Sequence, residues 1–354
     1  MQQDDPTESD ENTRLQTLPD AESERDAFVR LDPSGFQIRH PPPPHELITY
    51  ITPDAQLFQT IHMGAAVVDY TKYRLVIDGL VSRPLALTLA DLKQMPQTSI
   101  TAFHECYGSP LLPPTTSCLR IGNVHWTGVR LSHLLALAGC QPSSDPRFVW
   151  STGLDRGTFA GVRADAYQKD LPIAKALRPE VLVAYAMNGR PLSKERGGPV
   201  RLVVPGFFGT NSTKWLARLE VRAQRASGPY TTTFYNERDL AGRVVRPVWN
   251  VEVNCMIVSP GPGEVIKSSC ISVHGWAWSD EGVEVVEVSS DGGRDWLQAG
   301  VEDRFEYGWQ RFDVEMILQP GQYKLMARAT CSSGNRQPLS GHRNHVHSIE
   351  VLVE

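Results

Sequence analysis

Apolar and polar residues alternate over several short stretches of the chain, and a few stretches between them have helical spacing. Residues 73–80 (YRLVIDGL) alternate as a half-buried strand does, and residues 199–206 (PVRLVVPG) predict a buried strand that ends in a turn. Residues 88–93 begin with a threonine that suits an N-cap, and the helical spacing of residues 131–139 stops at a glycine. Because these elements follow no regular β-α-β rhythm, the pattern favours an α+β fold over a doubly wound sheet.

The pattern changes after about residue 225. Residues 230–246 are loop-like and contain several arginines and tyrosines, and short strands separated by Pro-Gly and Asp-Gly turns follow. We expect residues 247–354 to form a β-sandwich of immunoglobulin-like type, although the Cys…Trp…Cys spacing of antibody domains is missing.

The N-terminal part of the chain has a different character. Residues 1–30 are charge-rich and lack periodicity, which predicts a disordered acidic tail. The tetraproline between His40 and His45 predicts a stiff polyproline II strap, or alternatively a ligand for a proline-reading module. We therefore divide the chain into a tail and strap (1–45), a first domain (46–240) and a second domain (247–354).

Composition and charge narrow the function. The 354 residues are 41% hydrophobic and 21% charged, with a formal net charge of −5 and no long basic run. Such a chain gives no electrostatic reason to expect nucleic acid or an anionic membrane as a partner, so a small-molecule substrate is the default. No signal or transit peptide and no membrane-spanning apolar run is visible, which indicates a cytoplasmic location.

Six cysteines are scattered along the chain without a C-x-x-C pair, which argues against a zinc knuckle or a dithiol motif. Cys106 ends a predicted strand just before a Gly-Ser-Pro turn, so its sulfur could face a cleft and bind a soft or redox-active metal. The alternative is a buried core thiol. A nucleophilic pair with His104 is a further reading, but the orienting residue and oxyanion site of a hydrolase are not identifiable.

A second candidate is the glycine-rich segment 196–215. Four glycines (197, 198, 206 and 209) would let backbone approach a ligand, and nearby cations and hydroxyls suit a phosphate. No Walker loop or G-x-G-x-x-G fingerprint is present, and a solvated turn with scattered basic residues is the alternative. His62 by itself favours a structural role, because a lone histidine is more often a satisfied structural residue than a ligand.

Seven motifs occur in an order that resembles the sulfite oxidase family of molybdopterin-dependent enzymes. They are Phe58-x-x-x-His62, YRLVIDGLV from Tyr73, His104-Glu-Cys106-Tyr-Gly, WTGVRLSHLL from Trp126, AYAMNGRPL from Ala184, GPVRLVVPG from Gly198 and STKWL from Ser212. In the second domain, VSSDGGRDW from Val288 and NHVH from Asn344 resemble the family's dimerisation domain. The resemblance covers about residues 46–354 and implies a molybdopterin-binding first domain.

The resemblance implies roles for individual residues. Cys106 would ligate molybdenum, and Tyr235 would lie beside the metal, although Tyr230 is only five residues earlier. Arg201 would act both in catalysis and in cofactor binding. The other implied cofactor contacts are His62, Asp155, Arg196, Ser212 and Lys214.

Two departures from the family concern the substrate. Thr60 stands where sulfite-oxidising members carry arginine, and the sequence after the cysteine is Tyr-Gly-Ser-Pro-Leu instead of Ala-Gly-Asn-Arg-Arg. An oxyanion needs positive charge, which Arg156, Arg196 or Arg201 would have to supply.

The resemblance implies a homodimer that oxidises sulfite to sulfate by oxygen-atom transfer. Residues 1–45 are too short for a haem-binding domain, so we expect no haem and expect electrons to pass to an external acceptor or oxygen. The alternatives are a reductase or dehydrogenase of another small oxo compound, and a non-catalytic cofactor-binding module.

Overall fold

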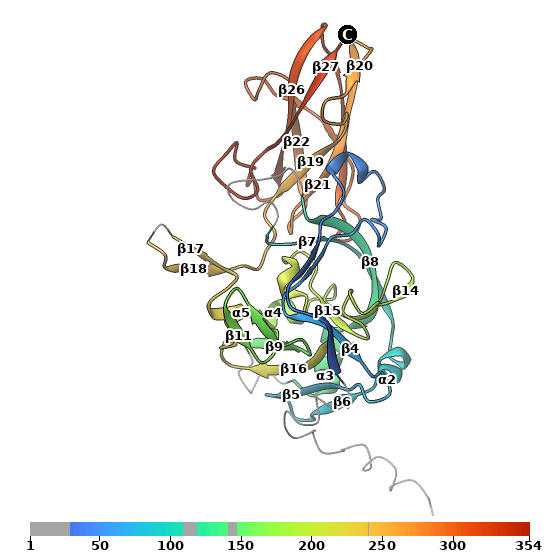
Figure 1. The fold of residues 1–354 in the computed structure, drawn as a ribbon, viewed down its shortest axis with the longest axis vertical. Coiled ribbons are helices and arrows are strands. Elements are labelled where there is room, and N and C mark those ends of the chain that lie inside the picture. The colour runs from blue at the N-terminus through green and yellow to red at the C-terminus, as the bar shows by residue number, and fades with distance from the viewer. Residues whose placement is uncertain (1–28, 109–118, 141–146, 240) are drawn as a thin grey trace, which may run out of the picture.

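Two strand-rich domains are stacked along the long axis of the molecule (Figure 1). The computed structural model describes residues 29–108, 119–140, 147–239 and 241–354. The predicted acidic tail, residues 1–28, lies outside the described residues. The first domain occupies the lower half of Figure 1, and the second domain, with the C-terminus, occupies the upper half.

Two larger sheets form the frame of the first domain. One runs in the order β12 (Gln168–Pro172), β9 (Phe148–Gly153), β16 (Leu216–Arg222), β5 (Leu75–Gly79) and β6 (Leu85–Leu87). The other runs β14 (Arg190–Pro191), β13 (Leu182–Met187), β8 (Ile121–Arg130) and β7 (Thr98–Glu105), and β15 (Arg201–Val203) also pairs with β13. Within these two sheets, β16 and β5 are the only strands that pair in parallel. Buried side chains from both sheets share one apolar core, which fixes the two sheets relative to each other.

Smaller elements complete the first domain. Four two-stranded sheets pair β1 (Val29–Ser34) with β4 (Gly64–Val68), β2 (Gln37–Arg39) with β3 (Gln59–Ile61), β10 (Gly157–Phe159) with β11 (Val162–Ala164), and β17 (Asn236–Arg238) with β18 (Val244–Pro247). The helices are α2 (Leu89–Gln94), α3 (Leu131–Leu137), α4 (Ile173–Ala176) and α5 (Pro229–Thr232), with 3-10 turns η2 (Pro44–Glu46) and η4 (Gly209–Asn211).

The predicted helices are present but short. The hydroxyl of Thr88 accepts a hydrogen bond from the backbone N–H of Asp91, and the Asp91 carboxylate accepts one from the N–H of Thr88. This capping box explains why α2 begins where the sequence predicts it. The described part of the chain is mostly strand, however, so the balance of helix and strand that we expected for an α+β domain is corrected in favour of strand.

Part of the predicted tail and strap belongs to the first domain. β1 and β2 lie before residue 45, yet they pair with β4 and β3. The tetraproline then leads into η2, and the buried side chain of Leu47 after it packs among tryptophans of the second domain. Backbone pairing, which hydropathy alone does not reveal, fixes this segment.

The second domain consists of two sheets that face each other across a shared core. One runs β19 (Asn254–Ser259), β21 (Cys270–Trp278), β25 (Gln310–Ile317) and β24 (Gly300–Val301). The other runs β20 (Val265–Ile266), β27 (His347–Val353), β26 (Gly321–Cys331), β22 (Val283–Ser289) and β23 (Leu297–Gln298). A sandwich of two sheets is therefore present, and its assignment to the immunoglobulin-like type stays a prediction.

The second domain packs directly on β7 of the first. The backbone N–H of Phe103 donates to the carbonyl of Tyr307 at 2.9 Å, and the N–H of Tyr307 donates to the carbonyl of Thr101 at 3.1 Å. The stacked rings of Trp276 and Trp309, with centroids 4.8 Å apart, lie in the apolar cluster between the domains. The strand that leads to Cys106 is thus held from both domains.

Candidate molybdopterin site

One cavity in the first domain gathers every residue that the sequence singles out for the site. It contains about 690 Å³ of space outside the protein atoms, part of which is open to solvent. Its lining includes all eight predicted residues: His62, Cys106, Asp155, Arg196, Arg201, Ser212, Lys214 and Tyr235. They come from segments between 62 and 235 in the chain, so the tertiary fold alone brings them together.

Cys106 directly follows β7, and its thiol is half-buried and not in a disulfide. Its backbone N–H donates to the carbonyl of Arg120 at 3.0 Å, which extends the pairing of β7 by one residue. The Sγ atom lies 3.7 Å from the Oγ1 atom of Thr60, which also lines the cavity. A thiol fixed at a strand end and open to a cavity can serve as a metal ligand.

The structure separates the two candidate tyrosines. Tyr235 lines the cavity, and its hydroxyl lies 2.5 Å from the Nε2 atom of His62. Tyr230 is not in the lining, and its buried hydroxyl has no hydrogen-bond partner among the described residues. Tyr235 has a backbone φ of +52°, in the left-handed region that non-glycine residues seldom adopt. Its placement in the cavity is therefore imposed by the surrounding loop.

Burial keeps this pair uncharged. Desolvation raises the pKa of the Tyr235 phenol, and the neighbouring Cys106 sulfur raises it further. Desolvation and the charge of Lys214 lower the pKa of His62 to about 3. At neutral pH a protonated phenol therefore faces a neutral imidazole, so the Tyr235 hydroxyl has a proton to donate.

Three cations surround the inner end of the cavity. Arg196 is paired with Asp54 at 2.6 Å and also donates to the carbonyls of Phe58 and Leu57. The Arg196 guanidinium thus binds the segment that leads to Thr60, and Arg196 also lines the cavity.

Arg201 and Lys214 have no carboxylate within ion-pair distance among the described residues. Arg201 donates to the carbonyls of Arg196 and Ser212 and stacks on Trp126, 4.9 Å from the ring centroid. The Nζ atom of Lys214 donates to the carbonyls of Thr60 and Glu195 at 3.2 and 3.0 Å. Carbonyls orient these cations without neutralising them.

The pKa values of Arg201 and Lys214 are lowered by burial and by the positive charges beside them. Burial and the charge of Arg196 lower the pKa of Arg201 to about 9. Burial, Arg201 and Arg196 lower the pKa of Lys214 well below its usual value. A bound anion would relieve both the desolvation and the mutual repulsion.

Two polar groups complete the predicted set. The Oδ1 atom of Asp155 is buried without a hydrogen-bond partner among the described residues, and burial raises the pKa of this carboxyl to about 7. The Ser212 hydroxyl accepts a hydrogen bond from the backbone N–H of Val204 at 3.2 Å and still lines the cavity. An orphaned carboxyl oxygen beside a cavity is suited to a ligand N–H.

The glycines of segment 196–215 have a different function from the one we predicted. A Cβ atom on Gly197 would lie 2.7 Å from the Cβ of Lys214, and one on Gly206 would collide with the Asp280 carboxylate of the second domain. Gly209 alone of the four lines the cavity, and a Cβ there would lie 3.0 Å from the His104 ring. These glycines allow close packing of the protein on itself, and the cavity is lined mainly by side chains.

Several lining residues escaped the sequence analysis. The Tyr167 hydroxyl donates to the carbonyl of Thr210 at 2.7 Å, and the Tyr167 ring packs on His62 with centroids 5.3 Å apart. His104, which the sequence analysis considered as a partner for Cys106, also lines the cavity, and its ring stacks on that of Phe58 with centroids 5.6 Å apart. No spacing in the sequence marks Tyr167, because its partners lie 43 or more residues away.

Arg343, from the second domain, lies next to the site. Its guanidinium is 4.1 Å from the ring centroid of Tyr107, which lines the cavity. Its Nη1 atom is 4.0 Å from the Glu105 carboxylate, and its buried Nη2 atom has no hydrogen-bond partner among the described residues. The residue lies more than 230 positions after Cys106, which explains why the local motif does not reveal it.

Comparison with known proteins shows which family of proteins this chain resembles. Residues 62–230 match the oxidoreductase molybdopterin binding domain, and residues 245–350 match the Mo-co oxidoreductase dimerisation domain. The chain is 31% identical over 331 residues to mitochondrial sulfite oxidase of Homo sapiens, covering 84% of this chain and 59% of that protein. It is 30% identical over 329 residues to sulfite oxidase of Gallus gallus, covering 70% of that protein.

A solved structure extends the match to three dimensions. The crystal structure of the sulfane dehydrogenase SoxCD from Paracoccus pantotrophus aligns with a TM-score of 0.77 and 28% identity, over 96% of this chain and 92% of that chain. Fold and site thus define a molybdopterin-binding oxidoreductase domain joined to a dimerisation domain. The chain belongs to the sulfite oxidase family. It spans about 59% of the length of the mammalian relatives that it matches.

The residues present fit the cofactor of this family. The cavity combines a free thiol, two cations (buried Arg201 and half-buried Lys214) without a carboxylate partner among the described residues, and the Asp155 oxygen that has no hydrogen-bond partner there. Within the described ranges, no three His, Cys, Asp or Glu side chains form a metal-binding group. No helix in the described part of the chain is long and apolar enough to cross a membrane.

Proposed function

We propose that this protein is a molybdenum-cofactor oxidoreductase that oxidises sulfite to sulfate by oxygen-atom transfer, with Cys106 as the protein's metal ligand. The observation that carries the proposal is that Cys106 lines the same cavity as the cations Arg201 and Lys214. When bound, the cofactor supplies two-electron oxygen-atom chemistry that amino-acid side chains cannot provide. The protein supplies ligation, orientation and charge.

The inner end of the cavity would hold the pterin and its phosphate. Lys214 and Arg201 would face the phosphate, because both line the cavity and neither has a carboxylate partner among the described residues. The unpartnered Asp155 oxygen would accept a hydrogen bond from a pterin N–H, and Ser212 and His62 would line the same pocket. Arg196 would act mainly by fixing residues 57–60, since its donors are already bonded there.

Tyr235 would hold a proton beside the metal. Its raised pKa keeps the phenol protonated, and the neutral His62 imidazole accepts its hydrogen bond when the substrate is absent. The same hydroxyl can instead donate to an oxygen atom of the substrate. This arrangement stabilises negative charge on that oxygen without placing an ion in the cavity.

An oxyanion substrate also needs a cation near Cys106. Arg201 is engaged with two carbonyls, which favours a cofactor role over the direct substrate contact that we expected. Arg343 offers an alternative, because its guanidinium lies on Tyr107, the residue after Cys106, and its Nη2 atom is unpartnered within the described ranges. The second domain would then contribute charge to the substrate pocket.

The test combines metal analysis with turnover. Purified protein should contain molybdenum and pterin in a one-to-one ratio with the chain, and sulfite should drive reduction of ferricyanide. Cys106→Ser should abolish this activity, whereas Cys140→Ser, at another half-buried free thiol, should not. Protein that contains molybdenum but does not oxidise sulfite would refute the substrate and leave the family unaffected.

The same experiment distinguishes the alternatives. Thr60, in place of a family arginine, favours a less anionic sulfur or oxo compound as the second candidate substrate, so thiosulfate and small oxo compounds belong in the panel. A wild-type protein that retains pterin yet turns over none of them would be a cofactor-binding module. Its pterin would then survive the Cys106→Ser change, because the phosphate contacts remain.

Three parts of the proposal concern the whole protein. It would be a homodimer formed by the dimerisation domain, it would contain no haem and pass electrons to an external acceptor or oxygen, and it would be cytoplasmic. Light scattering, the visible absorption spectrum, a panel of acceptors and cell fractionation test these points in turn.

A further inference from the structure

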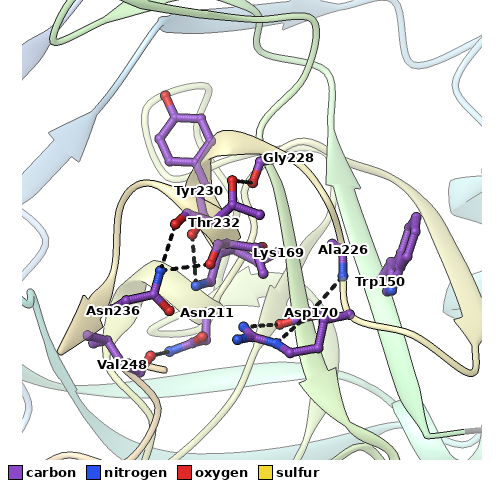
Figure 2. Close-up of polar contacts among 12 residues, drawn as sticks. Trp150, Lys169, Asp170, Asn211, Ala226, Gly228, Tyr230, Thr232, Asn236 and Val248 are labelled. Atoms are coloured by element: carbon purple, nitrogen blue, oxygen red, sulfur yellow. Dashed lines mark hydrogen bonds and ion pairs between the residues drawn. The ribbon is translucent and has the colours of Figure 1, made fainter. Parts of the chain in front are cut away.

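Lys169, on β12, is a buried cation outside the cavity that the proposed mechanism does not use. Its side chain is about 1% exposed, and it points from β12 toward the loop that carries Tyr230 and Tyr235. Figure 2 shows its ammonium group beside the Tyr230 carbonyl. A lysine removed from water needs compensating partners, so its surroundings indicate what it does.

The partners of Lys169 are polar and aromatic groups. The Nζ atom donates to the carbonyl of Tyr230 at 3.1 Å and lies 5.5 Å from the centroid of the Tyr235 ring. The neighbouring Asp170 does not compensate it directly, because both Asp170 oxygens bond to Arg225, at 2.9 and 3.0 Å. Lys169 forms no ion pair with any residue that the structure describes.

The loop that Lys169 contacts holds Tyr235 in a constrained conformation. The Asn236 side-chain amide donates to the carbonyls of Thr231 and Phe234 at 2.8 and 3.0 Å, which ties α5 to the start of β17. Tyr235 itself lies in the left-handed region. Its ring is therefore held at two points: His62 contacts the hydroxyl, and Lys169 faces the ring.

We propose that Lys169 is a positioning residue for Tyr235, which it fixes through the Tyr230 carbonyl and through the attraction between its ammonium charge and the ring. The attraction of a desolvated ammonium to an aromatic face is strong enough to select one ring orientation. The proposal rests on the role proposed for Tyr235 beside the metal. It adds a residue that is not part of the cavity lining.

The charge of Lys169 should depend on pH within the working range. Burial, with the charge of Arg225, lowers its pKa to about 8, while Asp170 acts in the opposite direction. The other titratable groups near it are the phenols of Tyr230 and Tyr235, both with raised pKa values. The turn η4, which packs on β12, places Thr210 and Asn211 there, and neither side chain titrates. Above about pH 8 the ammonium is lost, and with it the attraction to the ring.

Carbon-13 NMR of protein labelled at the tyrosine ζ carbon tests the contact without relying on turnover. The Tyr235 signal, assigned by its loss in Tyr235→Phe, should shift with an apparent pKa near 8. The step should be absent in Lys169→Met and in Lys169→Arg, whose guanidinium stays charged. Lys175→Met is the matched control, because Lys175 lies 5.1 Å from the Phe207 ring and is paired with Glu180, so the Tyr235 step should persist.

Turnover gives the second readout. Lys169→Met should lower kcat by about 10- to 30-fold at pH 7 with little change in KM, and Lys169→Arg should restore most of it and remove the loss of activity above pH 8. A Tyr235 signal that does not shift between pH 6 and 9 in the wild type would overturn the proposal. So would a Lys169→Met variant that is merely less stable, with wild-type kcat and pH profile. If no sulfite is oxidised at all, the NMR step still decides the role of Lys169.

Discussion

Trp278, in the second domain, donates a hydrogen bond of 2.8 Å to the carboxylate of Glu105, the residue that precedes Cys106. Glu105 is buried, and desolvation raises the pKa of its carboxyl to about 7. The indole N–H is therefore one of few groups that compensate a buried acid directly beside the proposed metal ligand. The dimerisation domain and the cofactor site are linked through this contact.

Trp278→Phe should weaken both stability and activity. The change keeps the aromatic packing but leaves a Glu105 oxygen without its donor, which costs about 1–3 kcal/mol of unfolding free energy. Denaturant titration measures the loss. Trp296→Phe, whose indole bonds only the nearby Gly293 carbonyl in the second domain, should leave turnover unchanged. Equal effects of the two changes on turnover would contradict the link between domains.

Tyr235→Phe should lower kcat about 100-fold, because the variant cannot donate a proton or hydrogen bond at the cavity. Tyr230→Phe is the matched control. The Tyr230 hydroxyl lies outside the cavity and has no partner among the described residues, so its removal should leave kcat within about twofold. Steady-state kinetics at saturating substrate distinguish the two, and a larger effect at Tyr230 would reverse their assignment.

Lys214→Met should change cofactor content and stability in opposite directions. The variant loses the cation proposed to face the phosphate, so molybdenum content should fall at least about tenfold. In cofactor-free protein the folded-state pKa of Lys214 lies well below its unfolded value, so at pH 7 holding its charge opposes folding. The variant should therefore melt about 5 °C higher than the wild type when both lack cofactor. A lower melting temperature would contradict an uncompensated Lys214.

Asp155 gives a pH dependence of known sign. Its folded-state pKa is about 7 and its ordinary value is 3.8, so the folded protein binds more protons between these pH values. The contribution of Asp155 is fully present below about pH 4 and is lost as the pH rises to about 7, a change of at most about 4 kcal/mol. In cofactor-free protein, Asp155→Asn should remove this part of the decline, as thermal melts at pH 5 and 8 can measure. Glu105, which remains in both proteins, provides the same background.

Thr60→Arg should strengthen the binding of an anionic substrate. Thr60 lines the cavity and lies 3.7 Å from the Cys106 sulfur, so a guanidinium there would reach a bound oxyanion. We expect the KM for sulfite to fall about tenfold, and to fall less at high ionic strength. Thr233→Arg, at an exposed position, controls for the added charge. An unchanged KM would show that the substrate already has a cation, for which Arg343 is the candidate.

Local patterns were sufficient to predict many elements. The alternation around β5, the capping residues of α2 and the apolar spacing of α3 each concern residues a few positions apart, and the structure contains these elements. The pairing of β1 with β4 could not be predicted in this way. It joins residues more than 30 positions apart in a segment whose composition resembles a tail.

The sequence by itself determined the family, because the seven motifs can be recognised in order without knowing their contacts, and it predicted the residues of the candidate site. Only the tertiary structure decided which contacts each of these residues makes. Arg196 and Arg201 have the same chemistry in the sequence, yet one is paired with Asp54 and the other has no carboxylate partner within the described ranges. Likewise, Tyr235 and not Tyr230 reaches His62. Lys169 and Arg343 were recognised only from the structure. Lys169 contacts a residue 61 positions away, and Arg343 contacts one more than 200 positions away. Burial and charge compensation depend on distance in space and not along the chain.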